Sequence, residues 1–228
     1  MRKTNRFSAA MGILFLMVVL TTAVPVFAST TGGWTVSKAR CSFLTPGEEK
    51  IFNKAVKGLM GVSYKPAALL AKQTVAGTNY VFLCQGTTVT KKPEIAWYIL
   101  NVNEDLKNKV SLLSVKKIEI SSVEVNKNPH QGTVDGGLEI IAFENKPEAL
   151  SKSVLKIFSK GIKKYAGYEL RPISLLGTQV VAGQNYRFLC YGAGPAGKDL
   201  FVVDTYRNVK GKCSISSCKS LDLEKYIN

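Results

Sequence analysis

The residues best suited to binding lie in one motif that occurs twice, Gln-x-Val-Ala-Gly-x-Asn-Tyr, at Gln73–Tyr80 and again at Gln179–Tyr186. The segments around it, residues 66–86 and 172–192, are identical at 13 of 21 positions with a constant offset of 106. The motif has no ionisable group before its tyrosine, so placing its tip in a partner's cleft removes no charge from water. Its glycine allows positive φ and close backbone approach. These properties favour non-covalent binding to another protein.

The sequence offers little for covalent or metal chemistry. His130 is the only histidine, in a stretch predicted to be a linker, and a Cys–His nucleophile needs the two side chains in contact. Residues 192–197 are rich in glycine, but they lie between two predicted strands and are interpreted as a flexible connection. The five cysteines show no metal-ligand spacing. We therefore expect no enzyme activity, no cofactor and no metal.

The odd number of cysteines leaves at least one thiol unpaired or shared between chains. Cys84 and Cys190 each end an apolar Phe-Leu-Cys and are predicted to be buried. Cys213 and Cys218 can bridge only if their segment leaves regular strand geometry, because a spacing of five places them on opposite faces. The pairing stays open among all five: Cys41, Cys84, Cys190, Cys213 and Cys218.

Residues 1–28 read as a signal peptide. A basic start precedes the apolar run Met11–Val24, and small residues end at Ala28, where we expect cleavage. The alternative is an uncleaved anchor, but the run is too short to span a bilayer comfortably. We expect a secreted or extracytoplasmic protein that does not insert into a membrane after cleavage.

The whole chain carries a net charge of +15, and without Arg2, Lys3 and Arg6 of the signal it keeps 28 basic and 16 acidic residues. A basic exported protein can favour anionic surfaces or acidic proteins. The lysines are scattered, however, without a block that aromatic residues interrupt, so we expect no nucleic-acid binding.

Each copy begins with a double glycine, Gly32-Gly33 or Gly136-Gly137, and continues with a predicted helix. Thr45-Pro46-Gly47-Glu48 is a capping box with proline at the first helical position, and Pro147 is predicted to open the second helix. Helical spacing then predicts two apolar stripes for the core: Ile51, Phe52, Ala55, Val56 and Leu59, and Leu150, Val154, Ile157, Phe158 and Ile162.

Two hairpins follow each helix. The first flanks the motif glycine, with strands predicted at Leu69–Val75 and Asn79–Cys84, and at Leu175–Val181 and Asn185–Cys190. The second runs through residues 95–118 in one copy and 200–215 in the other. One helix on a four-stranded antiparallel sheet is an α+β pattern. We expect two domains, at residues 29–120 and 136–228, joined by a linker at residues 121–135. Each domain is expected to carry one independent binding site.

A double glycine, a helix and a Gln-x-Val-x-Gly hairpin occur in this order in cystatins, and both copies resemble that family over nearly their whole length. The resemblance implies tandem cystatin-like domains, each one helix packed on a four- to five-stranded sheet, similar to exported bacterial domains of this type. It also implies inhibition of papain-like cysteine proteases, whose cleft a cystatin fills without reacting. The implied contact residues are Gly32, Gly33, Gln73, Thr74, Val75, Ala76, Gly77, Gly136, Gly137, Gln179, Val180, Val181, Ala182 and Gly183.

The sequence departs from the family at the second hairpin. Cystatins commonly carry Pro-Trp at its tip, whereas this chain has Glu104-Asp105-Leu106-Lys107 in one copy and Val209-Lys210-Gly211 in the other. Trp97 lies in a predicted strand and is no substitute. A missing aromatic anchor can remove a binding hot spot. The alternative is therefore an exported binding or scaffold protein of the same fold that inhibits no protease, in which the motif is only a good hairpin sequence.

Overall fold

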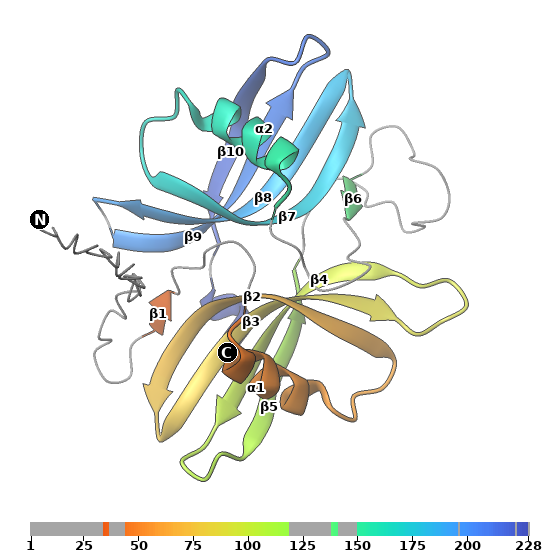
Figure 1. Cartoon of the computed structure of the whole chain (residues 1–228), viewed down its shortest axis with the longest axis vertical. Coiled ribbons are helices and arrows are strands. Elements are labelled where there is room, and N and C mark those ends of the chain that lie inside the picture. The colour runs from red at the N-terminus through yellow and green to blue at the C-terminus, as the bar shows by residue number, and fades with distance from the viewer. Residues whose placement is uncertain are drawn as a thin grey trace, which may run out of the picture.

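The computed structural model describes residues 34–36, 44–118, 138–140, 150–195, 197–221 and 223–227. These residues form two antiparallel sheets, each with one long helix against it, so the predicted α+β class is confirmed (Figure 1). The strand orders are β1-β2-β3-β4-β5 and β10-β9-β8-β7-β6. The predicted signal peptide, the predicted linker with His130, Cys41 and the double glycines all lie outside the described residues.

The first sheet consists of β1 (Trp34–Val36), β2 (Val62–Val75), β3 (Gly77–Thr88), β4 (Ile95–Glu104) and β5 (Val110–Lys117). The second consists of β6 (Leu138–Ile140), β7 (Glu169–Val181), β8 (Gly183–Gly194), β9 (Gly197–Arg207) and β10 (Cys213–Ser220). The helices are α1 (Pro46–Val56), α2 (Lys152–Ile162) and the short α3 (Glu224–Ile227). No helix of the described residues is long and apolar enough to cross a membrane.

The first helix begins as predicted and the second does not. The Thr45 hydroxyl accepts the Glu48 amide at 3.3 Å, and the Glu48 carboxylate accepts the Thr45 amide at 2.9 Å. The prediction that Pro147 opens the second helix is wrong, because α2 begins at Lys152 behind the N-cap Ser151. The Ser151 hydroxyl accepts the Val154 amide, one of the amides that a helix start leaves without a backbone partner.

Both hairpins are longer than the sequence predicts, and two prolines lie inside strands. The register of β2 with β3 shifts between Pro66 and Ala68, and that of β7 with β8 shifts between Pro172 and Ser174. The residue that leaves the ladder is Ala67 in one copy and Ile173 in the other, and a sheet tolerates proline beside such a bulge. The prolines therefore mark bulges and not the starts of the strands.

The helices cover one face of each sheet. Phe52 of α1 meets Phe82 edge to face at 5.4 Å between ring centroids, and Phe158 of α2 meets Phe188 at 5.0 Å. Helix α2 lies so close to β9 that a Cβ added at Gly161 would be 2.2 Å from the Thr205 methyl group. The predicted apolar stripes supply these contacts, although Leu59 lies beyond the end of α1 and is 41% exposed.

A third core lies between the two sheets, on the faces that the helices leave uncovered. The Trp97 indole nitrogen donates to the Leu176 carbonyl at 2.7 Å, both residues being buried. Leu176 lies where the register of β7 shifts, so its carbonyl can leave the ladder. The buried members of this core are Ala67, Ala68, Leu70, Ala71, Val81, Leu83, Trp97, Ile99, Ile118, Ile173, Leu176, Leu189, Tyr191, Leu200 and Leu221.

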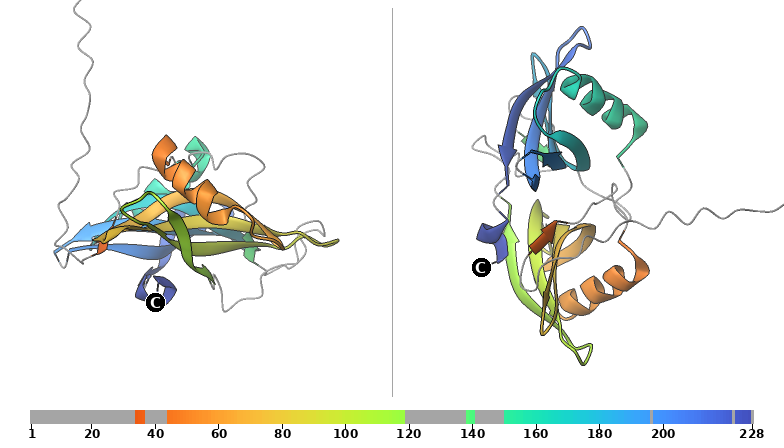
Figure 2. Two further views of the ribbon diagram at one scale, coloured as in Figure 1. Left: turned by 90° about the horizontal axis from the view of Figure 1, so that it is seen from below. Right: turned by 90° about the vertical axis from the view of Figure 1, so that its left-hand side faces the viewer.

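The C-terminal segment adds further contacts between the copies. The Asn101 side chain donates to the Ile227 carbonyl at 3.1 Å, and the Ser114 hydroxyl donates to the Tyr226 carbonyl at 3.2 Å. The two copies are therefore packed against each other. In Figure 2 helices α1 and α2 lie toward the same side of the molecule, each against the face of its own sheet that points away from the shared core.

The contact between Trp97 and Leu176 predicts a measurable loss of stability when only the indole nitrogen is removed. Trp97→Phe leaves the buried Leu176 carbonyl without its donor, so we expect a loss of about 1–3 kcal/mol in the free energy of unfolding. Urea denaturation of the full chain measures it and should show one transition. The control Val89→Ala, at a side chain 72% exposed, should change stability by less than about 0.5 kcal/mol. Equal stability of Trp97→Phe and wild type would contradict the role of this contact.

Candidate protein-binding site

Two turns meet at one end of each sheet. In the first copy a Cβ added at Gly77 would lie 2.2 Å from the Glu104 carbonyl oxygen, so the turn between β2 and β3 touches the chain that enters the turn between β4 and β5. In the second copy a Cβ at Gly183 would lie 2.5 Å from the Arg207 carbonyl oxygen. Both glycines have positive φ, +116° and +126°. Only glycine fits this combination of space and backbone conformation.

We call these two regions the hairpin ends. The first hairpin end comprises residues 74–77 and 104–109, and the second comprises residues 180–183 and 207–212. In Figure 1 the first lies at the lower left and the second at the upper right, where β2 and β7 end. The two hairpin ends therefore point away from each other, at opposite ends of the molecule.

The strand that follows each double glycine lies beside the motif. Trp34 of β1 pairs with Gln73, and Leu138 of β6 pairs with Gln179. The predicted site residues Gly32, Gly33, Gly136 and Gly137 lie outside the described residues. The strands that come after them nevertheless approach the hairpin ends from the edge of each sheet.

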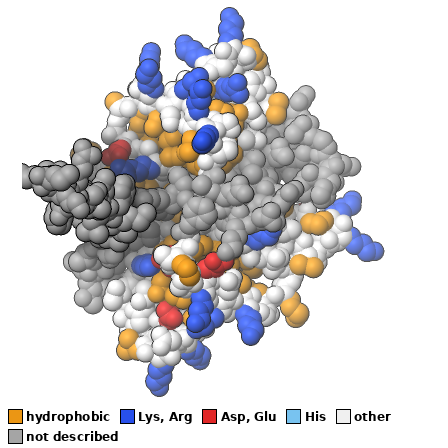
Figure 3. Space-filling model, viewed as in Figure 1, with side chains coloured by type: hydrophobic (Ala, Val, Ile, Leu, Met, Phe, Trp, Pro, Cys, Tyr) orange, Lys and Arg blue, Asp and Glu red, His pale blue; other side chains and the backbone are white. Residues whose placement is uncertain are grey.

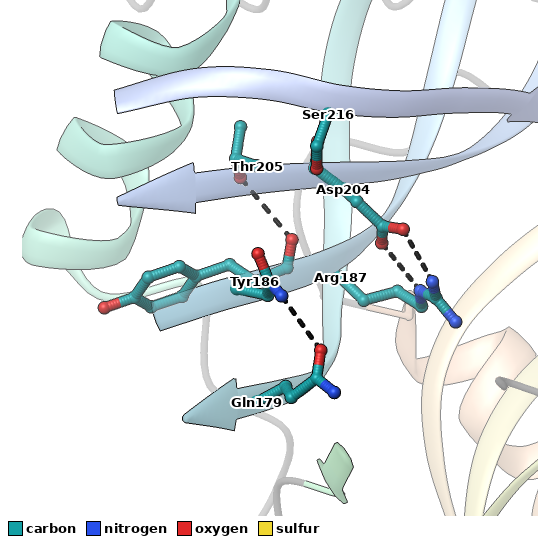
Figure 4. Close-up of polar contacts among 7 residues, drawn as sticks. Gln179, Tyr186, Arg187, Asp204, Thr205 and Ser216 are labelled. Atoms are coloured by element: carbon teal, nitrogen blue, oxygen red, sulfur yellow. Dashed lines mark hydrogen bonds and ion pairs between the residues drawn. The ribbon is translucent and has the colours of Figure 1, made fainter. Parts of the chain in front are cut away.

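The motif glutamine has a structural role. The Asn79 side chain donates to the Gln73 side-chain oxygen at 2.9 Å, and Asn103 donates to Asn79 at 2.8 Å, which links β2, β3 and β4. In the second copy Asn185 donates to Gln179 at 2.9 Å (Figure 4). The glutamine and asparagine of the motif therefore hold the two strands of the hairpin together.

The motif valines, by contrast, face solvent. Val75 is 40% exposed, and Val180 and Val181 are 39% and 41% exposed. Thr74, Ala76 and Ala182 are exposed as well. Of the predicted contact residues in the described part of the chain, these side chains are the ones free to meet a partner.

Sequence reasoning missed the apolar residue at the tip of the second turn. Leu106 is 82% exposed and Val209 is 83% exposed, and they occupy equivalent places in the two copies. Their signal in the sequence is a single aliphatic residue inside an otherwise polar turn between two apolar strands. Each hairpin end therefore presents an aliphatic side chain from both of its turns.

Hydrogen bonds within the second turn fix these side chains in place. The Asp105 carboxylate accepts the amides of Lys107 and Lys109 at 2.8 and 2.9 Å, and the Asn208 side chain accepts the Lys212 amide at 2.9 Å. A residue with positive φ, Asn108 or Gly211, completes each turn. In the second copy the Tyr206 hydroxyl also donates to the Ala182 carbonyl, which joins the two turns directly.

Charged residues near the two hairpin ends are arranged differently. In the first copy Lys72 forms a 2.8 Å ion pair with Glu48 of α1, and the Tyr80 hydroxyl donates to Glu104. Burial and then the Glu104 charge raise the pKa of Tyr80. In the second copy Arg187 and Asp204 form a two-bond ion pair at 2.6 Å between β8 and β9 (Figure 4).

The remaining candidates do not form a second site. Cys84 and Cys190 are buried, as predicted, and burial raises the pKa of the Cys84 thiol. No disulfide joins the four cysteines that the structure describes, and Cys218 packs into the core beneath α2. The described residues contain no group of three or more His, Cys, Asp or Glu side chains that could bind a metal ion.

Residues 192–194 and 197 belong to strands, so the predicted connection between the strands is shorter than the sequence indicates. Gly194 pairs with Gly197 at the end of the β8–β9 hairpin, and Gly192 lies within the ladder. A Cβ at Gly192 would be 2.4 Å from the Phe201 ring, so this glycine makes room for an aromatic side chain.

The first copy also has a hollow of about 520 Å³, at the end of the sheet opposite to its hairpin end. The hollow is shallow and lies between Met60, Tyr64 and Val89.

Comparison with protein-family models and with curated proteins finds no match to this chain.

The ion pair beside the first hairpin end predicts a pH-dependent stability. Burial alone would raise the pKa of Glu48, but hydrogen bonds from Lys72 and Thr45 outweigh it and bring the pKa below its ordinary value of 4.5. A carboxyl whose pKa is lowered by folding stabilises the protein above that ordinary value and loses the contribution as pH falls through the folded pKa. Glu48→Gln should therefore cost about 0.5–1 kcal/mol at pH 7 and progressively less below pH 4.5.

Urea denaturation at several pH values tests this. Lys72→Met should produce the same pH dependence, and combining it with Glu48→Gln should add little, because both remove one pair. A constant difference between Glu48→Gln and wild type across this range would show that the ion pair is not responsible.

Proposed function

We propose that each hairpin end is a wedge that enters the active-site cleft of a papain-like cysteine protease and blocks it without reacting. The observation that carries the proposal is the meeting of two rigid turns at each end, both with an exposed aliphatic side chain. The two turns carry Val75 and Leu106 in the first copy, and Val181 and Val209 in the second. The resemblance of the sequence to cystatins supports the same reading, and so does the strand that follows each double glycine.

The physical chemistry of the wedge suits a cleft. The apices carry aliphatic side chains, so insertion dehydrates no charge there. Each of these side chains contributes about 1.5–3 kcal/mol when fully buried, less the share already buried in the free protein. The hydrogen bonds inside the turns keep the ordering cost of binding low. Leu106 and Val209 take the place where cystatins commonly have Pro-Trp, and their smaller area favours weaker binding than an aromatic anchor gives.

In this proposal the protein acts outside the cytoplasm after cleavage of residues 1–28, as an inhibitor and not as an enzyme. Two tandem copies of a cystatin-like fold, each a helix on an antiparallel sheet, provide the two wedges. Its partners are the proteases, and nucleic acid and membrane play no part.

A second candidate, a binding or scaffold protein of this fold without inhibitory activity, is favoured by one observation. The motif glutamine bonds the motif asparagine, and the motif glycine makes room for the neighbouring turn. These contacts explain why the motif occurs twice without any protease. Inhibition assays with the full chain separate the two candidates.

The wedge proposal predicts that a charge at the motif turn abolishes inhibition. Val75→Asp with Val181→Asp should weaken inhibition of papain by about 100-fold or more, because each carboxylate loses several kcal/mol of hydration in the cleft. Both positions are about 40% exposed, so the free protein keeps its fold. Val89→Asp, another exposed valine but far from both hairpin ends, is the matched control and should inhibit like wild type. Equal inhibition constants for all three proteins would contradict the wedge.

The opposed hairpin ends predict two enzymes per chain. Titration of active papain with the full chain should end near two enzymes per inhibitor, and the two steps should not hinder each other. Sedimentation analysis of the mixture should show a complex of one chain with two proteases. An end point of one would mean that one hairpin end is inactive, and Val75→Asp or Val181→Asp alone would show which.

A further inference from the structure

We infer that the two hairpin ends take different targets, and that the second hairpin end selects a protease with an acidic cleft mouth. The inference rests on the proposed function and adds a partner class to one of its two sites. It comes from the charges that surround the aliphatic apices.

The two second turns are equivalent in the fold but differ in net charge, one being neutral and the other basic. Glu104 pairs with Thr78 in the ladder, and Arg207 pairs with Gln184 at the corresponding place. Residues 104–109 contain two acidic and two basic residues, so their charges cancel. Residues 207–212 contain three basic residues and no acidic one.

The nearby charges strengthen this difference. At the first hairpin end Lys72 is paired with Glu48, and Asp105 lies in the same turn as Lys107 and Lys109. In the second copy Asp204 of β9 is already paired with Arg187. Among the described residues no carboxylate forms an ion pair with the exposed side chains of Arg207, Lys210 and Lys212.

The positions of Arg207, Lys210 and Lys212 determine which step of binding their charges affect. They flank the aliphatic apex, so in a wedge complex they stay at the rim of the cleft, in contact with solvent. Rim charges act mainly on the association rate and its salt dependence, since they steer the encounter over roughly a Debye length, about 10 Å at 0.1 M salt. On the face shown in Figure 3 the Lys and Arg side chains are spread over both copies, so the control below tests for an effect of overall charge.

The test measures association rates with one hairpin end disabled at a time. Because the copies share a core, the full chain is used: Val75→Asp/Leu106→Asp leaves the second hairpin end active, and Val181→Asp/Val209→Asp leaves the first. The probes are two papain-like cysteine proteases of known structure, one with an acidic and one with a basic cleft mouth. Stopped-flow inhibition is recorded at low and at roughly 0.3 M salt.

For the acidic probe we expect the association rate of the second hairpin end to fall about tenfold or more with salt, and that of the first by less than about twofold. Lys210→Glu/Lys212→Glu should abolish this salt dependence, and the second hairpin end should then associate faster with the basic probe than with the acidic one. The control Lys160→Glu/Lys164→Glu makes the same change in net charge on exposed residues of the α2 region. This control should leave the salt dependence of the association rate unchanged.

The possible outcomes distinguish a failure of this inference from a failure of the proposed function. Inhibition by both hairpin ends with equal salt dependence and no preference between probes overturns the inference and leaves the proposed function standing. A control variant that behaves like Lys210→Glu/Lys212→Glu also overturns it, because overall charge would then be the cause. If neither hairpin end inhibits either probe, the proposed function itself fails.

Discussion

The central strands of both sheets are buried on both faces, and the placement of the two hairpin ends depends on that burial. Each sheet has a helix on one side and the other sheet on its second side, with the bond from Trp97 to Leu176 inside the shared core. A single copy would expose the apolar face that contains Leu70 or Leu176. The molecule is thus two repeats that stabilise each other, and its hairpin ends are held apart by packing.

Local signals in the sequence predict the elements that local contacts make. The capping box at Thr45 gives the start of α1, and the motif glycines give both first hairpins. The start of α2 was misplaced because a serine N-cap leaves a weaker signal than a proline. The bulges at Pro66 and Pro172, and the shared core, could not be predicted because they depend on contacts between residues far apart in the chain, 79 positions in the case of Trp97 and Leu176.

The residues of the candidate site could likewise be predicted from the sequence only in part. Repetition identified the motif, but it could not separate residues that build the hairpin from residues that a partner can reach. In the structure Gln73 and Gly77 build the hairpin, whereas Val75 is available. Leu106 and Val209 are aliphatic where the resemblance leads one to expect an aromatic anchor, and their exposure follows only from the geometry of the turn.

The difference between the copies is greatest where the fold constrains the sequence least. Residues 66–86 and 172–192, which supply both cores and the motif, are identical at 13 of 21 positions, whereas residues 104–109 and 207–212 share only two lysines. A turn needs one side chain to accept amides and one residue at positive φ, and the pairs Asp105 with Asn108 and Asn208 with Gly211 both meet that need. The other positions of the turn are less constrained and differ in charge between the copies. Since they lie beside the exposed aliphatic residues, under the proposed function changes there would alter which partner each hairpin end binds.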